Sequence, residues 1–102
     1  MKKIKTRDRI LQTSLALFNT VGEPNVTTLL ISDEMDISPG NLYYHFKSKG
    51  DIVEEIFDQY EHDMVDLLAV PEDADISLDQ QGFFLHLLFE TVARYRFLYQ
   101  DL

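Results

Sequence analysis

Apolar residues recur at helical spacing along most of the chain, and this pattern predicts an all-α protein. The first such segment has apolar residues three or four apart at Ile10, Leu11, Leu15, Phe18 and Val21. This spacing predicts a helix from about residue 6 to residue 20. Gly22 is a suitable C-terminal stop, and Pro24 prevents the helix from resuming.

A helix of about two turns is expected next. Its apolar stripe consists of Leu30, Ile31 and Met35, and Thr27 or Thr28 suits the N-cap because a threonine hydroxyl can accept a hydrogen bond from the first turn. Each of these two threonines can therefore mark the start of the helix.

A tight turn and another short helix follow. Asp36 stands where the turn should be, since aspartate tolerates the left-handed backbone conformation. Ser38 can cap the next helix, and Pro39 suits its first position because no backbone donor is needed there. Leu42 and Phe46 are four residues apart and can face inward together. Helix, short turn and polar helix form the helix-turn-helix pattern. The three helices are expected to share a small core of Leu11, Leu15, Phe18, Leu30, Ile31, Leu42 and Phe46.

A long helix is predicted from about residue 49 to residue 69. Ser48 and Asp51 have the spacing of a capping box at its start. Its apolar stripe is the clearest in the chain and consists of Ile52, Val53, Ile56, Phe57, Tyr60, Met64, Leu67 and Leu68. Residues 71–77 form a polar, acidic connection to the next element.

The last predicted helix begins at about Leu78, where Ser77 and Gln80 again have capping-box spacing. Its apolar residues lie on nearly all sides, so it needs neighbours on several sides. We expect the aromatic residues of this helix, Phe83, Phe84 and Phe89, to lie in the core. We expect His62 and His86, on the two long helices, to be packing or pocket-lining groups rather than metal ligands.

Charge is divided unevenly along the 102 residues, whose formal net charge is -9. Seven Lys or Arg against five Asp or Glu give residues 1–50 a net charge of +2, and two against thirteen give residues 51–102 a net charge of -11. An acidic half that faces away from DNA is compatible with a nucleic-acid partner for the basic half. The absence of cysteine excludes disulfides and thiolate metal sites.

The outward face of the short helix at residues 39–46 carries the candidate chemistry. Gly40 has no side chain, so another backbone can approach it closely. Asn41, Tyr43 and Tyr44 carry amide and phenol groups that can donate to phosphates or base edges. Lysines follow immediately, at Lys47 and Lys49. A helix that enters the DNA major groove needs these features.

Residues 6–53 resemble the DNA-binding domain of TetR-type transcriptional repressors. The resemblance rests on an ordered set of positions: Ile10, Leu11, Leu15, Leu17, Phe18, Gly22, Thr27, Thr28, Ser38, Gly40, Leu42, Tyr43, His45, Phe46, Lys47, Ser48 and Lys49. Residues 94–102 also look like a segment of the regulatory domain of one TetR subgroup.

The resemblance implies a DNA-binding role for each matching position. Gly40 and Asn41 correspond to positions that approach bases, and the two tyrosines after Leu42 to positions that touch bases or the sugar-phosphate strand. His45 and Lys49 correspond to phosphate contacts. The full expected DNA-binding set is Thr27, Thr28, Ser38, Pro39, Gly40, Asn41, Tyr43, Tyr44, His45, Lys47 and Lys49. Pro39 and Leu29 depart from relatives that place a long polar base reader there, which gives DNA shape more weight.

The resemblance also implies the organisation and the partners. Residues 1–48 are expected to form the helix-turn-helix DNA-binding domain with a basic N-terminal arm. Residues 49–102 are expected to be the connecting helix and the beginning of an all-helical regulatory domain that is truncated here. The expected partners are a double-stranded, near-palindromic DNA operator, a second copy in the full-length form, and an unknown small-molecule effector.

Two other function classes come into question. A truncated regulator could act as a protein-protein interaction module without operator binding, since the exposed aromatic end and the missing dimerisation region favour association. An enzyme is disfavoured because the chain has no cysteine nucleophile, no Gly-rich phosphate loop and no metal-spaced His-Glu motif. We therefore expect no cofactor and no metal. The N-terminal stretch lacks an unbroken apolar core, and nothing approaches the roughly 20 apolar residues of a membrane span, so a cytoplasmic protein is expected.

Overall fold

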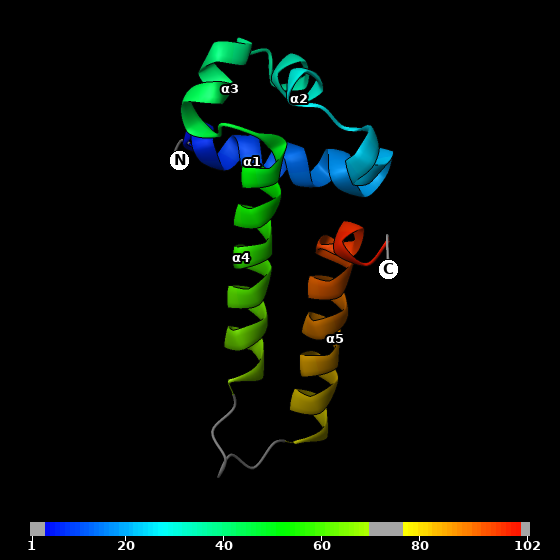
Figure 1. Cartoon of the computed structure of the whole chain (residues 1–102). Helices are drawn as coiled ribbons and strands as arrows, with labels where there is room; N and C mark the ends of the chain where they lie inside the picture. The colour runs from blue at the N-terminus through cyan, green and yellow to red at the C-terminus, as the bar shows by residue number, and fades with distance from the viewer. Residues whose placement is uncertain (1–3, 70–76, 101–102) are drawn as a thin grey trace.

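The computed structural model describes residues 4–69 and 77–100, and within them the fold is all helical (Figure 1). The elements are, in order, α1 (Thr6–Leu17), η1 (Phe18–Gly22), η2 (Glu23–Asn25), α2 (Thr28–Met35), α3 (Pro39–His45), α4 (Lys49–Leu68), α5 (Leu78–Arg94) and η3 (Arg96–Tyr99). The expected fold class is confirmed. In Figure 1, α1 lies across the upper ends of α4 and α5, with α2 and α3 on its other side.

The first helix ends differently from the prediction. After Leu17 the helical turns widen into the π-helix η1, so the helical path continues to Gly22 instead of ending near Thr20. Gly22 has φ 96°, a conformation that side chains rarely adopt, and its stop function is confirmed. Val21, which was assigned to the apolar stripe, is 46% exposed because η1 rotates it outward.

The structure contains the helix caps and the tight turn that the sequence predicts for the helix-turn-helix. Thr27 rather than Thr28 is the N-cap of α2, where its hydroxyl accepts a hydrogen bond of 3.1 Å from the Leu30 amide. Asp36 adopts the left-handed conformation (φ 56°, ψ 44°) that the turn requires. Ser38 caps α3 with Oγ, which accepts from the Asn41 amide at 3.0 Å. These contacts are between neighbours in sequence, so the sequence pattern specified them.

The core is larger than predicted. Leu15 and Leu30 are half-buried at its edge, and residues of α1 meet residues 95 and 97 in it. Its buried members are Ile10, Leu11, Phe18, Val26, Ile31, Met35, Leu42, Phe46, Ile52, Ile56, Tyr95 and Phe97. The helix-turn-helix unit therefore shares one core with the start of α4 and the end of α5.

The predictions for α4 and α5 were correct at the helix starts and wrong for several apolar side chains. Ser48 caps α4, and Ser77 and Gln80 form the expected capping box of α5. Phe83 and Phe89 are 63% and 69% exposed, so their placement in the core was wrong. Phe84 is half-buried, and Phe57 and Leu68 of the α4 stripe are also exposed. The reason is that, among the described residues, α4 is the element that packs extensively against α5, which leaves much of the α5 surface uncovered. The predicted acidic connection at 71–77 lies outside the described residues, except for Ser77.

Candidate nucleic-acid interface

Helix α3 is held by its inner face and presents its outer face. Leu42 and Phe46 are 2% and 4% exposed, which anchors one side of α3 to the core. The outward row expected from the sequence is present: Gly40 and Asn41 are exposed, as are Tyr43 (58%) and Tyr44 (78%). A seven-residue helix with this division is a convex ridge whose phenol and amide groups face solvent.

The tyrosines differ in their surroundings. The Lys47 ammonium lies 4.4 Å from the centre of the Tyr43 ring, and it donates a 3.3 Å hydrogen bond to the Tyr43 carbonyl. A cation over an aromatic face is weakly attracted, so Lys47 is held near the ridge while it stays exposed. Tyr44 meets only the edge of the half-buried His45 ring, with centroids 5.1 Å apart.

The two candidate threonines lie at the start of α2, at the opposite end of that helix from the turn that leads to α3. Thr27 is exposed and Thr28 is half-buried. The cap bond uses the Thr27 oxygen as an acceptor, and the hydroxyl proton remains available for a phosphate oxygen. Cap and phosphate contact are therefore compatible in one side chain.

Lys49 differs from the other lysine of the predicted set. Its ammonium donates to the Glu23 carbonyl at 2.9 Å and lies 3.5 Å from Glu23 Oε1. Lys49 was expected to contact a phosphate, whereas in this structure it joins η2 to the start of α4. Lys47 is the exposed cation of the pair.

The basic arm is only partly described. Lys2 and Lys3 lie outside the described residues. Arg7 lies 3.3 Å from Glu55 Oε2 on α4, with its guanidinium 4.8 Å from the centre of the Phe46 ring. Arg7 thus fastens α1 to α4, while Lys5 is exposed.

The two histidines of the long helices are not packed as expected. His62 is close to Asp66 at 3.3 Å, and His86 to Glu90 at 3.2 Å, one helical turn apart in each case. All four side chains are more than half exposed, so these are surface pairs of little energetic weight. Among the described residues no group of three His, Cys, Asp or Glu is placed to hold a metal ion.

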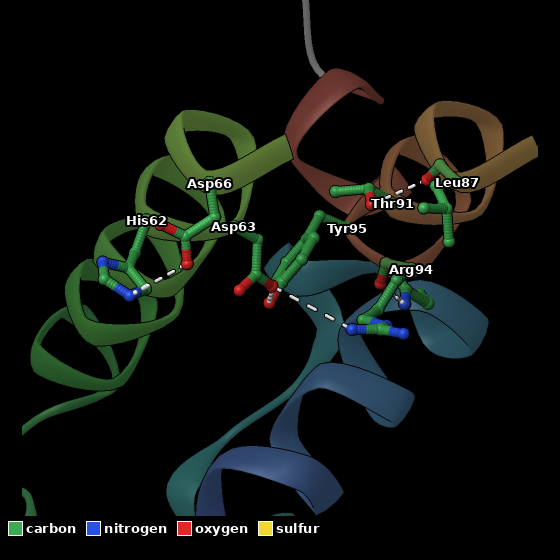
Figure 2. A network of polar contacts seen from close by, with 8 residues as sticks. His62, Asp63, Asp66, Leu87, Thr91, Arg94 and Tyr95 are labelled. Atoms are coloured by element: carbon green, nitrogen blue, oxygen red, sulfur yellow. Dashed lines mark hydrogen bonds and ion pairs between the residues drawn. The ribbon is translucent and has the colours of Figure 1, made fainter. Parts of the chain in front are cut away.

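A polar network joins α4 to the end of α5 (Figure 2). The Tyr95 hydroxyl donates to Asp63 Oδ2 at 2.7 Å, and Arg94 lies 3.9 Å from the same oxygen. Burial and this hydrogen bond raise the pKa of Tyr95 to about 12. The Tyr60 and Tyr99 hydroxyls also hydrogen-bond, which raises the pKa of Tyr99.

A groove of about 500 Å³ runs between α4 and α5, next to this network. Asp63, Asp66, Phe83, Phe84, Glu90 and Arg94 are among its lining residues. Its size lies within the range of small-molecule sites, which are usually clefts of about 300–1,000 Å³.

Sequence reasoning missed the contact of the chain's far end with the helix-turn-helix unit. The Asn19 side chain bonds to residues 94 and 97, and the Phe18 and Phe97 rings pack with centroids 5.0 Å apart. The partners are more than 70 positions apart, so no local pattern signals the pairing. No helix in the described part of the chain meets the length and apolarity of a bilayer-crossing segment.

Two family models match the chain. Residues 10–56 match the model described as bacterial regulatory proteins, tetR family, and residues 59–102 match the model described as bacterial transcriptional repressor. The boundary between the two matches falls within α4.

Individual relatives are similar over different lengths. The negative transcriptional regulator IcaR of the biofilm operon icaADBC of Staphylococcus epidermidis is 28% identical over 97 residues, which are 94% of this chain and 52% of that protein. The HTH-type transcriptional repressor KstR2 of Mycolicibacterium smegmatis is 42% identical over 50 residues, 49% of this chain and 24% of that protein.

Solved structures match the fold of nearly the whole chain. A TetR-family transcriptional regulator from Marinobacter aquaeolei VT8 superimposes with a TM-score of 0.89 at 49% identity, over 96% of this chain and 48% of that one. The probable transcriptional regulatory protein RHA5900 gives a TM-score of 0.67 at 25% identity, over 93% and 53%. The chain thus spans about half the length of the IcaR relative and of both solved chains.

Proposed function

Because the chain belongs to the TetR family of bacterial transcriptional regulators, we propose that it binds a near-palindromic double-stranded DNA operator as a homodimer. In this proposal residues 1–48 are the DNA-binding domain, and residues 49–102 are the connecting helix and the beginning of a regulatory domain. A regulator of this kind works in the cytoplasm, where the DNA is, and has no catalytic role.

The single observation that carries the proposal is the outer row of α3. Tyr44 is 78% exposed on a helix whose inner face is buried, so the outer row contributes little to the stability of the fold and is available to a partner. Lys47, held beside Tyr43, adds positive charge where a phosphate strand would lie. The proposed DNA-contacting set is the one expected from the sequence, with Lys47 rather than Lys49 as the readily available cation.

Repression and ligand response are the finer part of the proposal. IcaR is a negative regulator and KstR2 a repressor by their descriptions, and both are similar to parts of this chain. The groove between α4 and α5 is the candidate effector site because it lies beside the network that joins the two helices. Only three residues separate the end of α3 from the start of α4. A ligand that moves α4 would therefore change the position of α3.

The experiment selects duplexes from a random pool with the purified chain at low salt, and then measures the dissociation constant of the selected duplex across a salt series. A phenol that donates to a phosphate is worth about 1.5–3 kcal/mol, so Tyr44→Phe should weaken binding by roughly 10- to 150-fold. Lys47→Ala should weaken binding and lower the salt slope by about 1.

Two controls separate DNA contact from folding. Tyr44→Phe should change the free energy of unfolding by less than about 0.5 kcal/mol, because the ring is exposed. Arg96→Ala removes an exposed cation from η3, on the opposite side of α1 from α3 in Figure 1, and should leave the salt slope unchanged. Equal binding by the Tyr44 and Lys47 variants and the unmodified chain contradicts the proposal.

The interaction module remains as a second candidate because α5 has an exposed apolar face. Leu78, Leu85 and Phe89 share this face by helical spacing and are between 49% and 84% exposed. This candidate predicts that no duplex is retained at low salt, while the chain self-associates in sedimentation and Phe89→Ala reduces that association.

A further inference from the structure

Asn19 lies where the two parts of the chain meet and makes two hydrogen bonds to the far end. Its Nδ2 donates to the Arg94 carbonyl at 2.7 Å, and its Oδ1 accepts from the Phe97 amide at 3.0 Å. The Arg94 carbonyl is one of the last four of α5, which have no partner inside the helix. Asn19 therefore caps α5 from a segment 75 residues earlier, at the break between α5 and η3.

The neighbouring rings reinforce this contact. Phe18 is fully buried and Phe97 is 4% exposed, with ring centroids 5.0 Å apart and planes at 46°. Phe18 and Asn19 are the first two residues of the π-helix η1. A π-turn shifts the direction of side chains relative to a regular helix, and such turns are frequent at functional sites. The ring pair and the two Asn19 hydrogen bonds are called the Asn19 junction below.

A continuous series of contacts leads from the Asn19 junction to α3. η1 ends at Gly22, and Glu23 of η2 follows directly. Glu23 holds Lys49 through its carbonyl and its carboxylate. Lys49 is the first residue of α4 and stands four positions after His45, the last residue of α3. Each step is a hydrogen bond, an ion pair or a short length of chain.

We propose that Asn19 is a positioning residue for DNA binding: it holds the end of α5 against η1, and only the closed Asn19 junction keeps η1, α4 and α3 in the DNA-binding arrangement. This inference rests on the proposed operator binding and adds a second influence on the start of α4, and through it on α3. Coupling of this kind is reciprocal. If the closed Asn19 junction raises the affinity for DNA by some factor, bound DNA must favour the closed junction over the open one by the same factor.

The first measurement is amide hydrogen exchange on the whole 102-residue chain, free and bound to the selected duplex. The reporter is the Leu98 amide of η3, which donates to the carbonyl of the N-cap residue Tyr95 and not to Asn19. Duplex binding should slow its exchange in the unmodified protein. This arm needs no variant, so unchanged Leu98 exchange on duplex binding overturns the inference even where a substitution prevents folding.

The second measurement compares Asn19→Ala with Thr20→Ala. Thr20 is the matched control because its hydroxyl donates to the Ala16 carbonyl of the same helical segment at 2.8 Å. Asn19→Ala should speed exchange at Leu98 and weaken duplex binding by about 5- to 150-fold, the usual range of such couplings. The salt slope should not change, because no phosphate contact is removed. Thr20→Ala should alter neither quantity by more than about twofold.

Each outcome is decisive. The inference is overturned if Asn19→Ala exchanges faster at Leu98 but binds the duplex with the same affinity as Thr20→Ala. It is also overturned if Leu98 in the unmodified protein exchanges equally fast with and without duplex. In either case the Asn19 junction is a purely structural contact. Failure of the unmodified chain to retain any duplex overturns the proposed function itself. That result is seen before any Asn19 variant is made, so the two failures are distinguishable.

Discussion

The burial of Phe97 leads to a quantitative prediction about stability. Phe97 is 4% exposed and belongs to the core that also contains Phe18, Ile10 and Ile52. Truncation of a buried phenylalanine costs about 3–5 kcal/mol, from lost burial and the cavity left behind. Phe97 lies near the end of the described chain, where the surroundings can partly collapse, so we expect the lower end, about 3 kcal/mol. A domain of this size has roughly 5–15 kcal/mol of stability in total.

The assay is urea unfolding followed by far-ultraviolet circular dichroism. For small proteins the stability falls by about 1–3 kcal/mol per molar urea, so Phe97→Ala should lower the midpoint by at least about 1 M. The matched control is Phe89→Ala, the same substitution at a side chain that is 69% exposed. Its expected effect is within about 0.5 kcal/mol.

The comparison tests whether the far end of the chain is part of the core of the helix-turn-helix unit. Coincident midpoints for Phe97→Ala and the unmodified protein would refute this, and so would a larger loss from Phe89→Ala. A lower slope without a shifted midpoint would indicate that residues 95–99 undock before the rest unfolds.

Two further predictions concern backbone and pH. Gly22→Ala should lower the free energy of unfolding by more than about 1 kcal/mol, because alanine is strained at φ 96°. Gly82→Ala, in an open helical position, should raise the free energy of unfolding by about 0.5–1 kcal/mol. Melting temperatures that shift in opposite directions check both predictions. Burial and the Asp63 hydrogen bond raise the pKa of Tyr95 from 10.0 to about 12, so the folded protein holds this proton more tightly than the unfolded chain. The resulting stabilisation is complete below pH 10 and is lost as the pH rises toward 12. Melting temperatures across this window should fall less steeply in Tyr95→Phe than in the unmodified protein, and equal slopes would contradict the assignment.

The sequence predicted the features that depend on neighbours in the chain. The caps at Thr27, Ser38 and Ser77 and the left-handed turn at Asp36 each involve partners within about five positions. The outward row of α3 is of the same kind, because helical periodicity alone decides which positions are opposite Leu42. The exposure of the α3 row could therefore be predicted residue by residue, whereas the tie of Lys49 to Glu23 could not.

The errors have two physical causes. Periodicity identifies an apolar face but not whether a neighbour covers it, which is why Phe83 and Phe89 were wrongly placed in the core. The pairing of His62 with Asp66 was visible as a helical i, i+4 spacing and was overlooked. By contrast, nothing near Asn19 in the sequence indicates a partner on α5.

Lys49 shows how the family resemblance and the structure fit together. Its contact with Glu23 is about one-third exposed on both sides, and partly exposed ion pairs contribute only about 0–1 kcal/mol. The Phe18–Phe97 contact is buried and costs far more to separate. A displacement of α4 should therefore break Lys49 from Glu23 before it opens the far end of the chain. The ammonium has three donors, of which Glu23 occupies at most two, so Lys49 can donate another to a phosphate oxygen while it still ties η2 to α4.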